Sequence, residues 1–483
     1  VEGESPQEVL KGLAELTGTM PMPPKWAIGY QQCRYSYNPE SRVREIAEGF
    51  RSRQIPCDVI WFDIDYMAGY RVFTFNPMEF PNAKKLNEDL GKMGFHRIWM
   101  INPGIKAEDT AAANDPKPEE LAKAGKTEAW AAEMKRFQGL RGEALEKGYY
   151  VKTASGENYK GAVWPGLCYF PDFTGDGVRE WWTGLFTEYM AQGVDGVWND
   201  MNEPAIFNVA TKTMPEDNQH RGGVWRSRPG MPEVKVTAGP HARFHNVYGM
   251  LMAQGTYEGI AKANPTKRPF VLTRAQYVGG HRYAASWTGD NSATWTDLEQ
   301  TVPMVLNLGM SGQILTGPDI GGFVGNGPGK PGDKEAKGEF FARWMGIGSL
   351  MPFSRGHASK GSDNKEPWAY TDEVTKVCKA ALERRYRLLP YMYTLFREAA
   401  TTGLPVARPV FFADPKDMAL RGEDDAFLLG DAVLVVPQLM PDKTRTVVTP
   451  KGLWRGLTLV EGDDHAWLPR LKVRGGAIVP VGP

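Results

Sequence analysis

Two short segments of the chain place a carboxylate after an apolar run and beside a tryptophan. In the first, the run 193–198 ends in Trp198 and is followed by Asp200 and Glu203. In the second, Trp287 precedes Asp290. Two carboxyl groups flanking a bond are the minimal equipment for cleaving a glycosidic linkage, one acting as nucleophile or base and the other as acid. The residues therefore predict a carboxylate pair, with Asp200 or Glu203 as one member and Asp290 as the other.

A simpler explanation exists for each acid taken alone. An isolated Asp at the end of a strand more often caps a helix or closes a turn, because its side chain binds nearby backbone amides. The occurrence of two matching segments favours a catalytic role for these acids over a capping role. The neighbouring tryptophans fit the same hypothesis, since their faces suit the apolar face of a sugar ring.

Composition narrows the classes of partner. The 483 residues include 57 Lys plus Arg and 57 Asp plus Glu, so no net field attracts a polyanion. No basic stretch alternates with aromatic residues, and we expect no nucleic-acid binding. No run of about 18 apolar residues occurs, so we expect no membrane span. The 15 Trp, 18 Tyr and 21 Phe fit a pocket for neutral polyhydroxy ligands.

The cysteines and the chain ends bear on compartment. Cys33, Cys57, Cys168 and Cys378 form no CxxC pair, which argues against a zinc site or a disulfide scaffold. We expect reduced, mostly packed thiols and no metal. The absence of an N-x-[ST] sequon favours a cytoplasmic or bacterial protein. The chain starts at Val1 and stops in a strand-like run, so we expect both ends to be cut, and a removed leader would leave no trace.

Apolar runs alternate with amphipathic segments along most of the chain. Eight runs are candidate strands: 26–33, 57–65, 96–103, 194–200, 268–274, 284–290, 312–319 and 351–357. Candidate helices lie between them: 41–54, 83–93, 178–192, 242–263, 297–308 and 335–346. Strands that alternate with helices pair in parallel, and eight repeats close a barrel. The pattern predicts a (β/α)8 TIM barrel, whose chemistry lies where the strands end.

The pattern also predicts a division of the chain. We expect a catalytic barrel over 1–403, ended by a helix at 371–400, with long insertions at 104–177 and 205–240 after strands 3 and 4. The first insertion holds a helical stretch at 118–147. Beyond the barrel, 404–483 reads as short strands with β-branched residues, such as 406–411, 432–436 and 446–448. This predicts a small C-terminal antiparallel β-sandwich, truncated at its end.

Several other active-site motifs are missing. No GxSxG nucleophile elbow is present, and the glycine-rich run at 325–330 matches neither a dinucleotide fingerprint nor a phosphate loop. His241 and His245 lie four apart on a predicted helix and share a face, which is a possible metal pair. HExxH is absent and no third ligand is evident, so a packed or solvated pair is the better interpretation.

With both acidic segments in place, the chain closely resembles glycoside hydrolase family 31, and its α-glucosidases in particular. The resemblance rests on WNDMNE at 198–203 and WTGDN at 287–291. It extends in family order through WFDIDYM at 61–67, VWPG at 163–166, RPFVLTR at 268–274, GPDIGGF at 317–323 and PFSRGH at 352–357. These motifs span the predicted barrel.

The resemblance implies roles that the residues alone leave open. Asp200 matches the family's nucleophile and Asp290 its general acid/base, whereas Glu203 becomes a neighbouring acid that orients groups at the strand end. Arg274 matches a pocket arginine that favours a charged carboxylate and can bind a sugar hydroxyl. Retention through a covalent intermediate implies carboxyl groups roughly 5 to 5.5 Å apart.

The resemblance also implies the substrate pocket. Asp63 and His357 match residues that grip the terminal glucose, Met201 follows the nucleophile as in the glucosidase branch, and Asp319 lies outside the first layer. Apolar walls are implied for Ile64, Ile105, Trp164, Trp198, Trp287 and Phe323. The family's usual Arg-Asn-His triplet appears here as Arg355-Gly356-His357. Family members usually also carry an N-terminal β-sandwich, whose loop adds an acidic residue to the pocket, and a distal C-terminal domain. Neither domain is visible in this sequence.

The expected function is that of a retaining exo-acting α-glucosidase. It would release glucose from the non-reducing ends of oligosaccharides or α-glucans through a glucosyl-aspartate, with no cofactor or metal. The expected partner is a small-molecule or oligosaccharide substrate, and the sequence does not determine the oligomeric state. Two alternatives remain, a transglucosylase of the same family and a catalytically silent carbohydrate-binding subunit.

Overall fold

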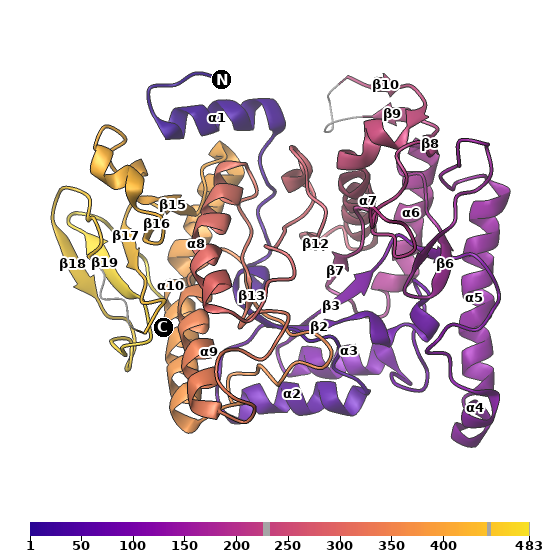
Figure 1. Cartoon of the computed structure of the whole chain (residues 1–483), viewed down its shortest axis with the longest axis horizontal. Helices are drawn as coiled ribbons and strands as arrows, with labels where there is room; N and C mark the ends of the chain where they lie inside the picture. The colour runs from indigo at the N-terminus through magenta and orange to yellow at the C-terminus, as the bar shows by residue number, and fades with distance from the viewer. Residues whose placement is uncertain (226–231, 442–445, 483) are drawn as a thin grey trace. The chain divides into compact units, whose positions relative to one another are not determined.

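The computed structural model describes residues 1–225, 232–441 and 446–482. Its chain divides into two compact units (Figure 1). Unit 1 comprises Val1–Tyr35, Ala47–Ile60 and Ala285–Pro483, and unit 2 comprises Ser36–Ile46 and Trp61–Ala284. Helix α2 (Glu40–Ser52) and strand β2 (Val59–Phe62) therefore contribute residues to both units.

Unit 2 is built around parallel strands. Strand β7 (Gly196–Asn199) pairs with β3 (His96–Ile101) on one side and with β12 (Val271–Thr273) on the other. All four residues of β7 are buried. Burial of both faces explains the continuous apolar run that precedes Asp200 in the sequence. The carboxyl ends of these strands are the positions that the sequence predicted for chemistry.

Two long helices cover this part of unit 2. Helices α6 (Asp176–Met190) and α7 (His241–Ala263) pack along each other and lie side by side in Figure 1. The two helices are so close that Gly259 has no room for a side chain, since a Cβ there would meet the Phe186 ring at 2.7 Å. Helix α3 (Ala83–Lys92) begins at Asn82, whose side chain accepts a hydrogen bond from the Lys85 amide.

The two predicted insertions of unit 2 carry their own structure. The first holds an antiparallel sheet in the order β4-β6-β5, together with helices α4 and α5. The second holds two short antiparallel pairs, β8 with β11 and β9 with β10. The elements are β4 (Ile105–Lys106), α4 (Pro118–Ala124), α5 (Thr127–Glu146), β5 (Gly161–Val163), β6 (Gly166–Tyr169), β8 (Gln219–His220), β9 (Gly223–Trp225), β10 (Val234–Val236) and β11 (Gly239–Pro240).

Unit 1 contains further parallel strands. Strand β1 (Tyr30–Gln32) pairs with Val59 and Ile60 of β2 and with β14 (Ser354–Gly356), and β14 pairs with β13 (Asp319–Ile320). Helices α9 and α10 pack together beside these strands (Figure 1). The α-helices that lie wholly in unit 1 include α1 (Pro6–Thr17), α8 (Trp295–Met310), α9 (Lys334–Gly348) and α10 (Asp372–Thr402).

The predicted sixth strand, at 284–290, is wrong as a regular strand. The structure assigns no strand to this segment, although the amides of Ser286 and Thr288 donate to the carbonyls of Leu315 and Gly317. The seventh candidate, 312–319, contributes only β13 at its end. Glycine and proline explain the difference, because Gly289 has φ 88° and Pro318 has no amide to donate.

The C-terminal part of unit 1 is antiparallel, as predicted. Five strands pair in the order β15-β16-β17-β19-β18. They are β15 (Ala407–Pro409), β16 (Phe427–Leu429), β17 (Val433–Val436), β18 (Trp454–Leu457) and β19 (Arg470–Arg474). Buried residues such as Val410, Leu428 and Leu434 form their core. The predicted strand at 446–448 is wrong, because this segment lies in irregular backbone.

The predicted fold class is confirmed, and most helices begin and end within two residues of their predicted bounds. The stretch predicted as one helix at 118–147 is two, because Gly125 adopts φ 65° and closes α4. The domain boundary after residue 403 stays a prediction. The four cysteines are free and buried, as expected.

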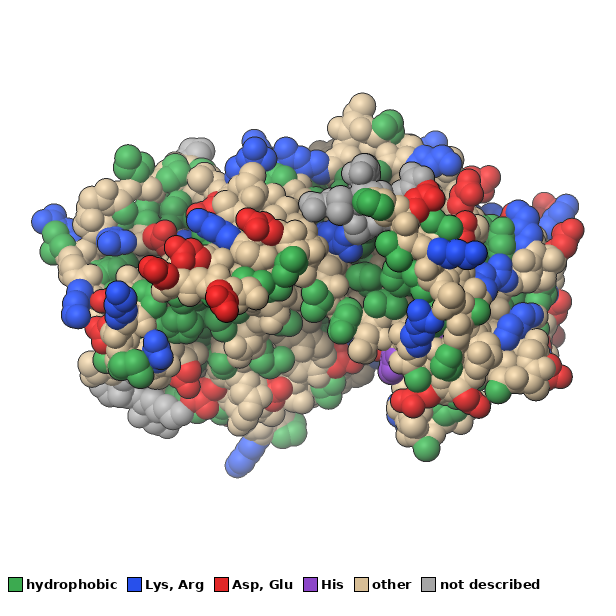
Figure 2. Space-filling view, turned by 90° about the horizontal axis from the view of Figure 1, so that it is seen from above, with side chains coloured by type: hydrophobic (Ala, Val, Ile, Leu, Met, Phe, Trp, Pro, Cys, Tyr) green, Lys and Arg blue, Asp and Glu red, His purple; other side chains and the backbone are tan. Residues whose placement is uncertain are grey.

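Lys and Arg side chains lie among Asp and Glu side chains on the face shown in Figure 2. Within the described residues, no helix is both long enough and apolar enough to cross a membrane.

The Arg384–Asp463 pair joins α10 to the C-terminal part of unit 1 and yields a stability prediction. Both side chains are buried, with Arg384 Nη1 2.9 Å from Asp463 Oδ1. Asp463→Ala leaves the arginine charge buried without its partner, and we expect a loss of about 3–5 kcal/mol in the free energy of unfolding. Urea denaturation measures this loss. Asp464→Ala, at the exposed neighbouring position, is the matched control, and equal effects of the two variants would contradict the prediction.

Candidate active site

Strand β7 delivers Asp200 to its end in unit 2. The Asp200 amide donates to the Ile101 carbonyl of β3 at 3.2 Å, so the parallel ladder continues up to the acid itself. Asp200 as a whole residue is 9 % exposed. The ring of Trp198 packs edge-to-face on Trp61, with centroids 5.8 Å apart. The strand therefore holds the Asp200 carboxylate at its carboxyl end with little freedom to move.

The backbone turns sharply after Asp200. Met201 has φ 58°, a left-handed conformation that side chains other than glycine rarely adopt. Asn202 fixes this turn from inside the unit, because its Nδ2 donates to Thr273 Oγ1 at 2.8 Å and its Oδ1 accepts from the Ala275 amide at 3.2 Å. Residues 200–204, which we call the Asp200 loop, are therefore tied to strand β12.

Arg274 links the two acids of the Asp200 loop. Its guanidinium makes two hydrogen bonds to Glu203, at 2.7 and 2.9 Å, and its Nε lies 3.4 Å from Asp200 Oδ1. The Nη2 group also donates to the Met201 sulfur at 3.1 Å. Because Glu203 takes the bidentate contact, the arginine is fixed in orientation while it keeps Asp200 in the field of its positive charge. The geometry thus gives Glu203 the orienting role.

Asp63 follows β2 in unit 2. Its Oδ1 accepts from the Ile64 amide at 2.7 Å, which caps the short 3-10 helix η2 (Ile64–Tyr66). Asp63 is 6 % exposed, and Ile64 is buried. The residue therefore acts as a cap, and that contact fixes the direction of its carboxylate.

Aromatic rings extend from the first insertion of unit 2. Trp164 packs edge-to-face with Tyr70 at 6.2 Å and with Phe207 at 5.1 Å between ring centroids. Phe207 is 40 % exposed. Ile105 is buried in β4, opposite Tyr169 of β6. Phe207 was not predicted, because it lies in the insertion 205–240, where no helical or strand periodicity marks it.

Asp290 belongs to unit 1 and is exposed. It follows Gly289, whose φ of 88° turns the chain out of the irregular segment 284–290. Its neighbour Asn291 anchors this turn by donating to the Asp319 carbonyl at 3.2 Å and accepting from the Phe323 amide at 3.1 Å. The turn that carries Asp290 is thus tied to strand β13 and to the glycine-rich segment after it.

A buried ion pair lies beneath this turn. Arg355 of β14 and Asp319 of β13 are both fully buried, with Arg355 Nη2 2.7 Å from Asp319 Oδ1. The same guanidinium lies over the Trp287 ring, 5.1 Å from its centroid. Burial raises the pKa of Asp319 to about 6, with Asp290 adding to the rise, despite the opposing charge of Arg355. Arg355 was not a predicted site residue, because its position before Gly356 carries no sign of burial.

His357 and Phe323 complete the predicted residues of unit 1. Their rings lie 4.7 Å apart between centroids. Burial, followed by the charges of Arg355 and Lys365, holds the pKa of His357 well below its usual range, so the imidazole is neutral. Lys365 Nζ donates to the Gly325 carbonyl at 2.8 Å, and burial lowers its pKa to about 8.

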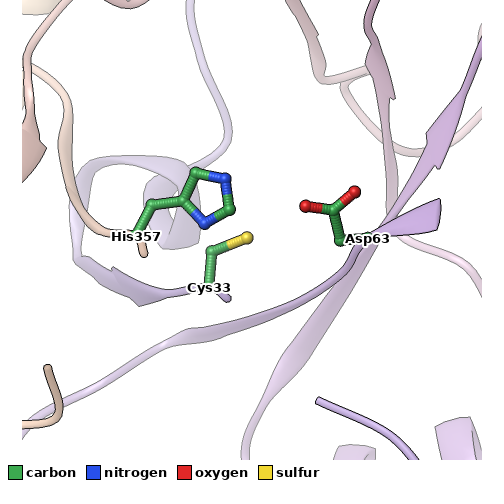
Figure 3. Close-up of side chains that lie close together, drawn as sticks. All are labelled: Cys33, Asp63 and His357. Carbon is green, nitrogen blue, oxygen red and sulfur yellow. The ribbon is translucent and has the colours of Figure 1, made fainter. Parts of the chain in front are cut away.

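Cys33 lies beside His357 (Figure 3), with ligand atoms within 4.8 Å of each other. Figure 3 also labels Asp63, which belongs to unit 2. The thiol and imidazole of unit 1 supply two ligands, whereas zinc sites use three or four protein ligands. The pair alone is not a zinc site.

The predicted residues divide between the two units. Unit 2 contains Asp63, Ile64, Ile105, Trp164, Trp198, Asp200, Met201, Glu203 and Arg274. Unit 1 holds Trp287, Asp290, Asp319, Phe323 and His357. The separation of Asp200 from Asp290 therefore stays a prediction.

Comparison with known proteins decides the family. Residues 20–395 match the model described as the glycosyl hydrolases family 31 TIM-barrel domain, and residues 403–479 match the glycosyl hydrolase family 31 C-terminal domain. The chain belongs to glycosyl hydrolase family 31. The predicted resemblance is confirmed.

Individual members of family 31 are also similar. Alpha-glucosidase 2 of Bacillus thermoamyloliquefaciens is 42% identical over 96% of this chain and 53% of its own length. The family 31 α-glucosidase structure from Bacteroides thetaiotaomicron is 46% identical, with TM-score 0.79 over 100% of this chain and 70% of that one. A Flavobacterium johnsoniae dextranase complexed with glucose is 30% identical, with TM-score 0.82 over 100% of this chain and 55% of that one. The chain spans about half the length of the curated relatives it matches.

The raised pKa of Asp319 predicts a pH-dependent stability. An acid whose folded-state pKa is raised binds more protons folded than unfolded, so stability falls as pH rises from about 3.8 to about 6. Asp319→Asn cannot ionise and lacks this fall. We expect its free energy of unfolding, relative to the unaltered protein, to be more favourable at pH 7.5 than at pH 4. Denaturant titrations at both pH values measure this difference, and a constant difference would refute it.

Proposed function

We propose that this chain is the catalytic part of a retaining exo-acting α-glucosidase. The observation that carries the proposal is the Asp200 loop, where a buried carboxylate at a strand end lies 3.4 Å from a guanidinium held by a second acid. A guanidinium this close favours the charged form of a carboxylate, which is the form that a nucleophile needs. The family membership supports the same assignment.

Asp200 would attack the anomeric carbon of a terminal glucose. Its approach direction is set by the β7 ladder and by the Met201 turn, so little freedom is lost when substrate binds. Attack forms the bond from carbon to Asp200 and breaks the bond to the leaving oxygen. The guanidinium of Arg274 balances the negative charge of Asp200 before attack, and it is a donor for a sugar hydroxyl.

Asp290 would supply the proton. It donates to the leaving oxygen in the first step and then, as a carboxylate, takes a proton from water that attacks the glucosyl-aspartate. Two displacements on opposite faces return the original configuration. The ties of Asn291 to Asp319 and Phe323 support this role by fixing the turn that carries the acid.

The proposed substrate is a terminal α-linked glucose of an oligosaccharide or glucan. Asp63 and His357 are the proposed acceptors and donors for its hydroxyls, since both are buried polar groups of fixed orientation. The apolar walls would come from Trp164, Trp198, Ile64, Ile105, Met201, Trp287 and Phe323. Names of relatives support glucose as the sugar, because they include an α-glucosidase and a glucose-bound dextranase.

Hydrolysis can be tested directly on the full chain with an aryl α-glucoside. We expect Asp200→Ala to lower kcat by more than about 10⁴-fold, because no group remains to form the covalent intermediate. Asp290→Ala should lose about 10²–10⁴-fold with an ordinary alkyl leaving group, yet much less with a fluoride, which needs no proton to leave. Asp464→Ala, with an exposed carboxyl, is the control. The first sugar released should be the α-anomer by NMR.

The outcomes separate the rival functions. If glucosyl transfer to a sugar exceeds hydrolysis at high oligosaccharide concentration, the chain is a transglucosylase and not a hydrolase. A folded protein that binds maltose but releases no aryl alcohol would replace the enzyme by a silent binding subunit. Release of the β-anomer would overturn the retaining mechanism while leaving the glucosidase in place.

A further inference from the structure

Three histidines and an aspartate lie together in unit 2, outside the predicted site residues, and they include the pair His241 and His245 that the sequence placed on one helix face. His220 Nδ1 lies 2.6 Å from Asp172 Oδ1, and His220 Nε2 lies 2.9 Å from His241 Nδ1. The rings of His241 and His245 follow at 4.9 Å between centroids. Asp172, His220 and His241 are each at most 1 % exposed. We call these four residues the histidine cluster.

The hydrogen bonds of the cluster limit how many protons it can hold. Asp172 accepts from the Arg221 amide and from the Thr174 hydroxyl, so it is a carboxylate and His220 Nδ1 is a donor. Only one proton can then lie between His220 Nε2 and His241 Nδ1. If both nitrogens carried protons, two donors would face each other at 2.9 Å. His241 Nε2 has no hydrogen-bond partner among the described residues.

The cluster reaches the Asp200 loop through one hydroxyl. Thr213 Oγ1 donates to the Pro204 carbonyl at 3.0 Å, and it accepts from His245 Nε2 at 3.3 Å. The Ala205 amide donates back to the Met201 carbonyl at 3.1 Å. Helix α7, which carries His241 and His245, also contacts the loop at Gly249, where a Cβ would meet the Asn202 carbonyl oxygen at 2.6 Å. The loop is therefore supported from the cluster's side by α7 and by Thr213.

We propose that the histidine cluster positions the Asp200 loop through the hydrogen bonds of Thr213. Uptake of a second proton between His220 and His241 then releases the loop. The effect of this positioning on catalysis rests on the proposed function. Its structural part, release of the loop by acid, stands apart from that function.

The surroundings of His241 favour the one-proton state. Burial, followed by the nearby His220 and His245, lowers the pKa of His241 to about 3, and Asp172 only partly opposes this. Arg221 adds positive charge 3.8 Å from Asp172, and the Tyr248 hydroxyl is engaged with the Pro171 carbonyl. A histidine with a lowered folded-state pKa binds more protons once released. Loop release therefore becomes easier as pH falls from about 6.5 towards 3.

Hydrogen exchange of peptide 201–213 in the full chain tests the release. Corrected for intrinsic rates, the protection of this peptide should fall by up to about tenfold per pH unit between pH 6.5 and 4.5, because opening then takes up a proton. His241→Asn keeps a partner for His220 but cannot take up that proton, and its protection should stay constant. Equal pH dependence in both proteins would overturn the proposal.

Thr213→Val tests the positioning role without altering any titratable group. The valine has the same shape but cannot bridge His245 and Pro204. We expect kcat on an aryl α-glucoside to fall about tenfold at pH 7 with KM nearly unchanged, since a small misplacement of a reacting group lowers the rate steeply. Thr211→Val is the matched control, because Thr211 is exposed and, among the described residues, its hydroxyl donates to the Thr213 carbonyl of the same insertion.

The two experiments also separate failure of this proposal from failure of the proposed function. A Thr213→Val protein with unchanged kcat would overturn the positioning role, whereas the control should keep the full rate. If the unaltered chain released no glucose at all, the proposed function would fail. The exchange measurement would then still decide whether acid releases the loop.

Discussion

The contact of Arg274 with two carboxylates is the interaction on which the site in unit 2 depends. Two negative charges at one strand end repel each other, and both Asp200 and Glu203 lie within reach of the same guanidinium. Glu203 binds it at 2.7 Å in a bidentate geometry and leaves Asp200 at 3.4 Å. The closer acid fixes the arginine, and the more distant acid lies in the field of its positive charge. Replacing the arginine by lysine would keep the charge but lose the planar fork that makes this division possible.

Unit 1 contains a buried pair of charged side chains that has few other partners. Arg355 and Asp319 pair without exposure to solvent, and the same guanidinium lies over the Trp287 ring. Burial outweighs the attraction of the arginine for Asp319, whose pKa rises to about 6. The pair therefore fixes the position of neighbouring groups more than it contributes stability. The Asp290 turn is built on this base through Asn291.

The histidine cluster is a further set of buried polar groups, and it supports the Asp200 loop. A buried chain of hydrogen bonds has a definite number of protons, and its geometry fails when one more is added. Thr213 binds His245, whose ring packs on the ring of His241, and it donates to the Pro204 carbonyl. The proton count of the cluster thereby sets the support of the Asp200 loop. The long insertion at 205–240 is therefore more than a surface connection between β7 and α7.

The sequence by itself determined most of the elements and the candidate acids, while the choice of Asp200 over Glu203 came from the family resemblance. Apolar runs ending in Asp200 and Asp63, and helical periodicity such as that of α9, follow from local patterns of side chains along the chain. Tertiary structure decided the irregular segment 284–290, the burial of Arg355, the exposed ring of Phe207 and the joining of Asp172 to His220 and His241. These depend on partners far apart in the chain, and on glycine and proline backbone geometry, neither of which local periodicity records.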